Sequence, residues 1–464
     1  DFAKAPLSSY GPSEEIRKLE GHIQNTKDRI ALDEKKIKTY DMDRDDIKFA
    51  RDYYKMRSDK YDTISKIQLT DNAYFIEGYV PSKYASDLVK KIEASTKAYV
   101  ELTDPTEEDD VPVCLQNGFF ADPMETVVDS YSLPSRTEFD PSKILSLFYY
   151  IFFGMMLSDA GYGLLIVIGT AVVLLKAKNM KPDSKKLIKL FFYSGISTVV
   201  WGVLFGSFFG DSVDIIAHVF FKVPAEQQVL VPFLKSLHVY WFEPVREPMR
   251  LLVFAFILGI IHLFTGLFLK FYILVKQGLI KDAIYDVVSW FMFVAGGICC
   301  LLGMDMVTNM LGLSFTLPKN VTTIAGIVTA LGALIVVLTG GRESKNWFKR
   351  LLKGAYAAYG VTGWLSDILS YSRILALGLA TGVIAQVFNK MGSMVQIPFV
   401  GAIIFILVFV VGHVLNLGIN ILGAYVHTNR LQFVEFFGKF YEGGGKKYTP
   451  FTEDTKFFHV KEEK

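Results

Sequence analysis

The chain has 464 residues, of which 51% are hydrophobic and only 21% are charged. Its mean hydropathy is +0.31, and its long unbroken apolar runs exclude a soluble domain of this size. The net charge of +2 argues against a nucleic acid as partner. We therefore expect a mainly α fold with a polytopic membrane domain.

The start of the chain and its cysteines add two expectations. The sequence begins with Asp1 and a hydrophilic segment, so we expect no signal peptide, and the absent methionine suggests that further residues precede Asp1. Cys114, Cys299 and Cys300 have no spacing typical of a metal site or a disulfide. They are expected to be small buried hydrophobic residues.

Residues 1–70 are rich in charge and are predicted to form a cytoplasmic coiled-coil arm. We expect one helix over residues 13–64, because apolar residues recur at heptad spacing from Ile16 to Tyr61. One helix cannot bury its own apolar stripe, so the arm needs a second strand from a preceding segment or a partner chain. The alternative is a solvated charged helix.

Residues 71–141 are predicted to form a small cytoplasmic α/β lobe. Residues 73–80 and 99–102 have the composition of strands, and residues 82–95 have that of a helix.

Residues 142–442 are predicted to form the membrane domain. Its first apolar stretch, 143–177, exceeds the ~20 residues of one span and is interrupted at 158–163 by glycines and an aspartate. A single crossing would put the arm and the following lysines on opposite sides of the membrane. A re-entrant hairpin keeps both in the cytoplasm, as the positive-inside rule requires.

Six further spans follow the hairpin, which brings the prediction to eight membrane segments, the first two of which need not cross completely. With this order every basic loop is cytoplasmic, residues 211–247 form an external loop, and residues 443–464 form a cytoplasmic tail. The six spans are expected at residues 187–209, 249–275, 283–304, 321–340, 359–391 and 399–440.

Arg373 lies at the expected depth of the bilayer. Arginine keeps its proton at physiological pH and costs ~2.5–3.5 kcal/mol at a helix centre on insertion scales. Asp367 is not at i,i+3 or i,i+4 spacing, so Arg373 has no obvious partner of its own in this chain. It is a snorkelling residue, a member of an internal salt bridge, or a fixed positive charge on an ion path.

Two groups of residues near Arg373 have separate expected roles. Ser370 and Tyr371 lie directly beside it and are further candidates for an ion path. The small residues at 378–382 are predicted to serve close helix packing.

The last helix has a line of polar residues that must face protein or water. The line is either a hydrogen-bonded seam between helices or one wall of a hydrated ion path. Its members are His413, Asn416, Asn420, His427 and Arg430, followed about one turn later by Glu435.

No nucleotide-binding loop is visible. The glycine run at 443–445 lacks the first glycine of a P-loop and follows a helix rather than a strand.

Four motifs resemble one known family. Residues 370–377 (SYSRILAL) are similar to the penultimate-helix motif of the V-type ATPase subunit a family, called subunit I in bacteria. Residues 427–436 (HTNRLQFVEF) with 439–441 resemble its last-helix motif. Residues 159–163 (DAGYG) resemble the break in its first hairpin, and residues 77–81 resemble its soluble lobe.

The resemblance implies the membrane stator subunit of a rotary ATPase, which couples ATP turnover to ion transport but is not catalytic itself. The essential arginine of the family falls on Arg373 and the supporting one on Arg430. The implied partners are a rotor ring of c/K-type subunits with a buried carboxylate, peripheral stalk subunits of E/G type, a central stalk connector of d/C type, and lipid. No cofactor is implied on this chain, because ATP is bound by partner subunits. The implied location is a bacterial plasma membrane, with both termini cytoplasmic.

Two positions depart from the eukaryotic members of this family and leave the transported ion open. Asn420 stands where a glutamate is frequent, and Thr381 stands where a histidine is frequent. Both H⁺ and Na⁺ therefore remain candidates, with a slight preference for Na⁺. The rival interpretation is a stand-alone secondary transporter or channel, but we find no inverted repeats, and the charged arm would have no role. A structural scaffold would leave the two arginines unexplained.

Overall fold

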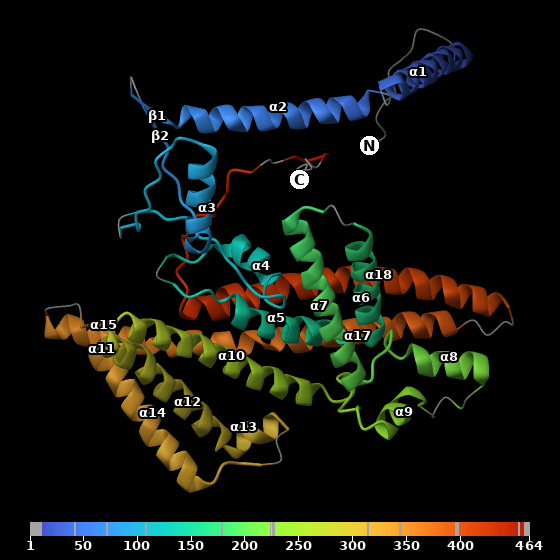
Figure 1. The fold of residues 1–464 in the computed structure, drawn as a ribbon. Coiled ribbons are helices and arrows are strands. Elements are labelled where there is room, and N and C mark those ends of the chain that lie inside the picture. The colour runs from blue at the N-terminus through green and yellow to red at the C-terminus, as the bar shows by residue number, and fades with distance from the viewer. Residues whose placement is uncertain are drawn as a thin grey trace. The chain divides into compact units, whose positions relative to one another are not determined.

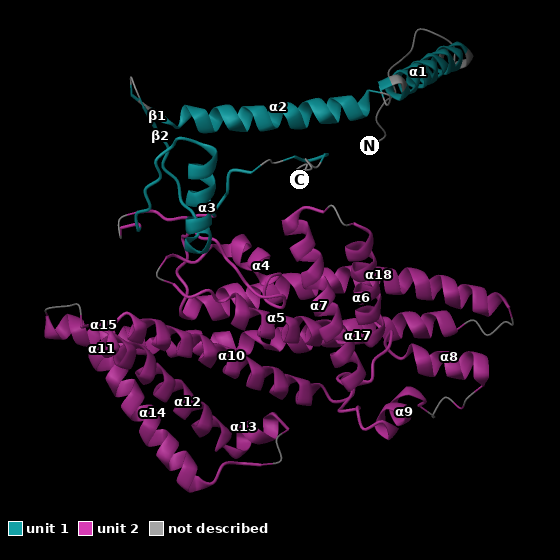
Figure 2. Ribbon diagram, in the orientation of Figure 1, with its two compact units in different colours: residues 1–104, 448–464 teal, residues 105–447 magenta. Residues whose placement is uncertain are grey.

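The structure is a computed structural model of the chain, and its regular structure is almost entirely helical, as the composition predicts (Figure 1). By contact it divides into two compact units, residues 1–104 with 448–464 and residues 105–447 (Figure 2). The structure describes residues 12–40, 43–70, 73–106, 109–136, 138–177, 180–222, 224, 228–312, 315–342, 346–394, 399–452 and 455–458.

The charged N-terminal region forms two helices, α1 (Pro12–Tyr40) and α2 (Arg44–Ser65), so the prediction of one helix over 13–64 is wrong. Residues 41–46 contain four aspartates, which favour helix starts over helix interiors, and Asp45 and Asp46 occupy the first turn of α2. The heptad stripe of α1 is more than half exposed at Ile16, Leu19, Ile23, Ile30 and Ile37.

The strands of the expected lobe are mostly absent. Helix α3 (Ser82–Ser95) has the predicted bounds. The strand expected at 73–80 is reduced to β2 (Tyr74–Phe75), which pairs antiparallel with β1 (Gln68–Leu69). Residues 99–102 form no strand. The composition favours β-structure there, but no strand in the described part of the chain pairs with these residues and supplies the hydrogen bonds that would stabilise it.

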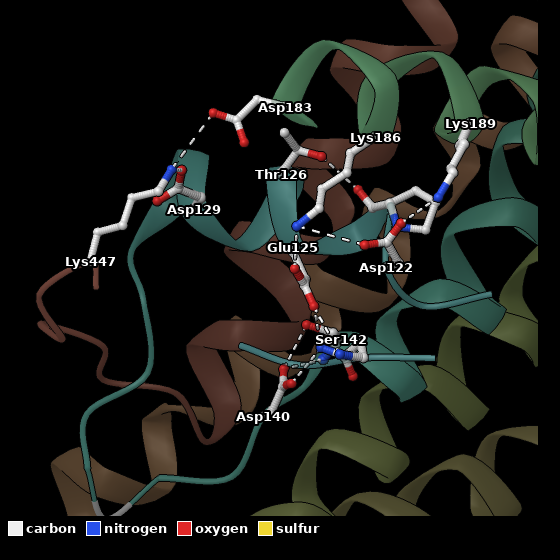
Figure 3. Close-up of polar contacts among 12 residues, drawn as sticks. Asp122, Glu125, Thr126, Asp129, Asp140, Ser142, Asp183, Lys186, Lys189 and Lys447 are labelled. Atoms are coloured by element: carbon white, nitrogen blue, oxygen red, sulfur yellow. Dashed lines mark hydrogen bonds and ion pairs between the residues drawn. The ribbon is translucent and has the colours of Figure 1, made fainter. Parts of the chain in front are cut away.

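Residues 105–141, which the sequence assigned to the lobe, lie in the second unit. Cys114 in this segment is exposed, so the expectation that it is buried is wrong. Helix α4 (Met124–Tyr131) is joined by ion pairs to α7 (Pro182–Phe205) (Figure 3). Lys186 Nζ lies 2.5 Å from Glu125 Oε2, and Lys189 Nζ lies 2.8 Å from Asp122 Oδ2. These contacts attach the segment to the basic end of α7.

The first apolar stretch is interrupted where predicted. Helix α5 (Ser142–Leu157) ends at Ser158, which has a left-handed backbone with φ of 44°. Helix α6 (Ala160–Lys176) then begins, and the Asp159 carboxylate accepts a hydrogen bond from Tyr162 N as its N-cap. Helix α6 packs mainly along α7 and makes few contacts with α5.

Among the described residues, six helical segments are long and apolar enough to cross a membrane, and they correspond to the six predicted spans. They are α7, α10 (Pro248–Lys276), the continuous run of α11 (Ile280–Ala283), η1 (Ile284–Val288) and α12 (Ser289–Leu302), α14 (Lys319–Thr339), the run of α15 (Trp347–Tyr359), α16 (Val361–Ser370) and α17 (Ser372–Ser393), and the run of α18 (Val400–Arg430), η2 (Leu431–Phe436) and η3 (Phe437–Lys439).

Two details of this region differ from prediction. The span expected at 359–391 is broken at Gly360 and Tyr371, and α15 precedes it. The region expected as an external loop, 211–247, contains α8 (Ser212–Phe221) and α9 (Leu230–Ser236). A further short helix, α13 (Asp305–Met310), connects α12 to α14. Helix α5 is largely buried and packs against α7, α17 and α18, which brings the last two helices together with α10 around the candidate site.

Candidate functional site

Arg373 lies near the start of α17, directly after the break at Tyr371. Its Nε donates a hydrogen bond of 2.9 Å to the carbonyl oxygen of Ser370, the last residue of α16. Carbonyl groups at a helix C-terminus carry partial negative charge and interact favourably with a cation. The break between the two helices therefore holds the guanidinium at one defined point.

The sequence-based expectation that Arg373 has no partner in this chain is wrong. Its Nη2 lies 2.5 Å from Oε1 of Glu435, and the side chains of Arg373 and Glu435 are 19% and 2% exposed. Glu435 lies in η2, 62 positions along the chain, so no helical spacing rule reveals this internal salt bridge. The pair is incomplete, because Arg373 Nη1 and Glu435 Oε2 are buried without a hydrogen-bond partner among the described residues.

Asp367 forms a second ion pair beside the first. Its Oδ2 lies 2.5 Å from Nζ of Lys439, which also lies 3.9 Å from the centre of the Trp364 ring. Lys439 belongs to the last-helix motif at 439–441 but was not among the predicted site residues. Both pairs connect the α16–α17 region to the end of the last helix.

Tyr371 contacts a histidine that sequence reasoning missed. The Tyr371 hydroxyl lies 2.8 Å from Nδ1 of His262, which stacks on Phe436 with ring centroids 4.3 Å apart. The Tyr371 ring packs directly against Gly259 of α10. A Cβ at position 259 would lie only 2.5 Å from the ring, so a larger residue there would clash with it. A lone histidine inside the apolar run 251–264 was the available signal for His262.

Three members of the polar line form a buried hydrogen-bonded seam. Nδ1 of His413 lies 2.5 Å from the Tyr162 hydroxyl, which also accepts a 2.8 Å hydrogen bond from Asn416 Nδ2. Asn420 Nδ2 donates to Asn416 Oδ1 at 2.6 Å. His413 Nε2 lies 2.9 Å from Oδ1 of Asn389. Neither Tyr162, which lies in the motif at 159–163, nor Asn389 was predicted as a site residue, because their proximity to His413 depends on how α6, α17 and α18 pack.

The rest of the polar line lies in different surroundings. His427 is half-buried, and its Nδ1 has no hydrogen-bond partner among the described residues. Arg430 is exposed, and no ion pair or hydrogen bond of its side chain is present in the described part of the chain. The two arginines therefore differ, because Arg373 is largely buried and paired whereas Arg430 is exposed.

A cavity of about 310 Å³ borders α17 at residues 378–386, beyond Arg373 along the helix. Its wall includes three carboxylates, Asp211, Asp214 and Glu243, and the small residues Gly378 and Gly382 of α17. Asp211 also accepts a hydrogen bond from Asn389, the partner of His413. Burial raises the pKa of Asp211 and of Glu243 above their ordinary values. Gly378 also lies against α5, since a Cβ there would be 3.1 Å from the carbonyl oxygen of Met155, which agrees with the predicted packing role.

Comparison with known proteins gives a consistent family assignment. Residues 7–229 and 361–453 match the V-type ATPase 116kDa subunit family. The chain is 34% identical over 423 residues to A-type ATP synthase subunit I of Methanocaldococcus jannaschii, covering 87% of this chain and 58% of the relative. It is 31% identical over 417 residues to the same subunit of Pyrococcus horikoshii, with 88% and 58% covered.

A bacterial relative is also similar. V-type ATP synthase subunit I of Chlamydia trachomatis is 26% identical over 411 residues, which cover 78% of this chain and 59% of the relative. The chain thus spans less than two thirds of the length of these relatives. The second matched region, 361–453, contains both Arg373 and Glu435. The chain belongs to the V-type ATPase 116kDa subunit family.

Proposed function

We propose that this chain is the membrane stator subunit of a rotary ATPase and forms the half-channels through which H⁺ or Na⁺ reaches and leaves the rotor ring. Relatives in this family are named subunit I of A-type or V-type ATP synthases, which supports a place in such a complex. The observation that carries the proposal is Arg373: a largely buried guanidinium in an apolar helical segment, with one buried donor, Nη1, still unused among the described residues.

Arg373 acts in this proposal by electrostatics. Each rotor subunit presents a carboxylate that is neutral or ion-bound while it faces lipid. Two opposite charges ~4 Å apart at an effective dielectric constant of ~20 gain about 4 kcal/mol. Contact with Arg373 therefore stabilises the ion-free carboxylate, lowers its affinity for the cation and releases the cation into one half-channel.

Rotation completes the cycle. The carboxylate moves on to the other half-channel and reloads, while the permanent charge of Arg373 prevents cations from passing directly between the two. Arg430 shares the pairing or keeps the exit path positive. The polar residues that we assign to the half-channels are Asp367, Ser370, Tyr371, His413, Asn416, Asn420, His427 and Glu435.

The remaining parts have supporting roles in the proposal. The charged N-terminal helices form a coiled-coil arm and, with the small lobe, bind peripheral stalk subunits of E/G type, and a d/C-type subunit connects the central stalk. The membrane domain has eight segments, counting α5 and α6, and both ends of the chain are cytoplasmic. ATP is bound by partner subunits, and the chain itself is not catalytic.

Replacing Arg373 tests the proposal directly. In the assembled complex, Arg373→Ala and Arg373→Lys should each lower ATP-driven ion transport at least about tenfold. Lysine is expected to fail because it lacks the planar fork of arginine and can lose its proton when desolvated. Transport into proteoliposomes is followed with a membrane-potential dye, which reports either cation. The control is Arg250→Ala, which removes an arginine that is 67% exposed and paired with Glu247. Near-normal transport with either Arg373 variant would refute the role.

Arg430→Ala should cause a smaller loss than Arg373→Ala, because Arg430 is exposed. The same transport assay measures both. If Arg430→Ala abolished transport and Arg373→Ala did not, the ranking of the two arginines would be reversed.

Purification separates this proposal from the rival of a stand-alone transporter. We expect nucleotide-binding subunits to accompany the chain when it is purified from native membranes. A chain that transports ions after purification without them would support the rival.

A further inference from the structure

The salt bridge between Arg373 and Glu435 joins only one nitrogen of the guanidinium to one oxygen of the carboxylate. A guanidinium and a carboxylate commonly join through two parallel hydrogen bonds. Here only Nη2 and Oε1 meet, at 2.5 Å, while Nη1 and Oε2 stay buried without partners among the described residues. Leaving buried charged atoms unsatisfied is costly. The pair is therefore poorly optimised as a permanent structural contact.

The two members also differ in access and in attachment. Glu435 is closed off at 2% exposure, whereas Arg373 keeps 19% of its side chain exposed. Nε of Arg373 is bound to the Ser370 carbonyl, so this contact can hold the guanidinium while its other nitrogens exchange partners. Of the two side chains, Arg373 is therefore the more accessible to a carboxylate from outside the chain.

Glu435 lies in a part of the last helix that departs from regular α geometry. Residues Leu431–Phe436 form a π-helical turn, a feature that is rare and often found at functional sites. The adjacent pair of Asp367 and Lys439 has an additional contact, since Lys439 Nζ lies over the Trp364 ring, 3.9 Å from its centre. Of the two ion pairs, only the one with Glu435 has a member in the π-helical turn.

We propose that Glu435 is the resting counter-ion of Arg373. It neutralises the guanidinium when no rotor carboxylate is opposite, and it gives up or shares the arginine when one arrives. Without it, Arg373 would hold each rotor carboxylate longer, because no second anion competes for the positive charge. Glu435 is thus a positioning residue that sets how readily the rotor is released. The inference rests on the proposed function of Arg373 and adds a competitor from the same chain.

The test separates the charge of Glu435 from its shape. Glu435→Gln keeps the size and a hydrogen-bonding oxygen but removes the charge, whereas Glu435→Asp keeps the charge on a shorter side chain. We expect ATP-driven transport to fall about tenfold or more in Glu435→Gln and to fall less in Glu435→Asp. A purely structural role in packing or hydrogen bonding predicts the opposite order.

The matched control is Glu125→Gln. Glu125 is also a buried glutamate in a 2.5 Å ion pair, with Lys186 (Figure 3). It lies on α4, and its side-chain partners among the described residues are Asn117 and Lys186 rather than either arginine. Its variant should keep transport within about twofold per assembled complex. Transport that is normal in Glu435→Gln, or equally low in Glu125→Gln, overturns the inference about Glu435. The proposed function fails separately, through normal transport in Arg373→Ala.

A structural measurement covers the case in which Glu435→Gln does not assemble. In the unmodified complex imaged in several rotary states, the closest oxygen of Glu435 should lie beyond about 4 Å from Arg373 when a rotor carboxylate is in contact with the arginine. In states without that contact the pair should be closed. A distance that does not change between these states would overturn the exchange.

Discussion

At the scale of single residues, Arg373 is bound through some of its nitrogens while another keeps its hydrogen-bonding capacity unused among the described residues. Its three nitrogens have three different surroundings: Nε is bound to the Ser370 carbonyl, Nη2 to Glu435, and Nη1 to no group in the described part of the chain. A guanidinium stays charged at any physiological pH, so these surroundings decide where its charge is directed. Arg430, exposed on the last helix, has no comparable anchor among the described residues.

Asp52 carries a prediction about pH within the N-terminal unit. It is buried on α2, and its Oδ2 accepts hydrogen bonds from Phe457 N at 2.6 Å and Phe458 N at 3.2 Å. Burial raises the pKa of this carboxyl, but the backbone N–H groups of residues 456–458 and the Arg51 side chain outweigh it, and the net pKa is lowered. A lowered pKa in the folded state means that the contact is present above the ordinary value of 3.8 and lost as pH falls through the folded value.

We expect Asp52→Asn to release this segment at neutral pH, because the amide cannot replace a charged acceptor. Amide hydrogen exchange at Phe457 and Phe458 should speed up about tenfold. The control is Asp45→Asn, which removes an exposed carboxylate paired with Lys48 and should leave exchange there unchanged. Equal exchange in Asp52→Asn and the unmodified protein would contradict the assignment.

Individual residues of the site could be predicted from the sequence, but their contacts across helices could not. The cost of a charge in an apolar segment singled out Arg373, and the three- and four-residue steps placed His413, Asn416 and Asn420 on one face. Glu435 was identified, but its contact with Arg373 was not, because it depends on how the last two helices pack. The same holds for His262 and Tyr162, which reach the site from α10 and α6.

At the scale of elements, helices α6 and α7 approach closely at Gly202. A Cβ at this position would lie 2.0 Å from the backbone nitrogen of Ala160, which no side-chain movement can relieve. Gly202→Ala should therefore destabilise the helix packing by ~1–3 kcal/mol. The measurement is the thermal unfolding midpoint of the detergent-solubilised complex, which should fall.

Gly169→Ala is the control for this change, because Gly169 lies on α6 and a Cβ there would have no neighbouring atom within 4 Å. Its midpoint should stay the same or rise slightly, since alanine has the higher helix propensity. Equal midpoints for the two variants would show that α6 and α7 do not pack this closely.

Element boundaries were predictable where one physical signal dominates. The length needed to cross a bilayer located six spans, and the glycines with Asp159 located the break between α5 and α6. The breaks at Gly360 and Tyr371 were missed because hydropathy continues across them. The prediction of a strand at 99–102 was wrong, because a strand needs a partner strand to pair with and composition alone does not show whether one is present.

At the scale of the whole molecule, the polar groups along the last two helices bear on the choice of ion. Near His413 most of the bonded groups are amides and hydroxyls, which supply oxygen atoms but do not titrate in the physiological range: Asn416, Asn420, Asn389 and Thr381. The carboxylate of Asp211 joins them, since its Oδ1 accepts a 2.9 Å hydrogen bond from Asn389 Nδ2. His413 itself is held between Tyr162 and Asn389. Oxygen-rich surroundings suit a partly dehydrated metal cation such as Na⁺ better than stepwise proton transfer between titrating groups.

We therefore expect the ATPase activity of the assembled complex to increase with Na⁺ at fixed pH and fixed ionic strength. The reason is that a Na⁺-coupled rotor stalls when its carboxylates cannot reload, and ATP turnover then stops with it. Replacing Na⁺ by K⁺ at the same ionic strength is the control for general salt effects. Activity that does not depend on Na⁺ but drives acidification of proteoliposomes would identify H⁺ instead, and the amide-lined seam would then be a packing device that leaves proton transfer to other groups.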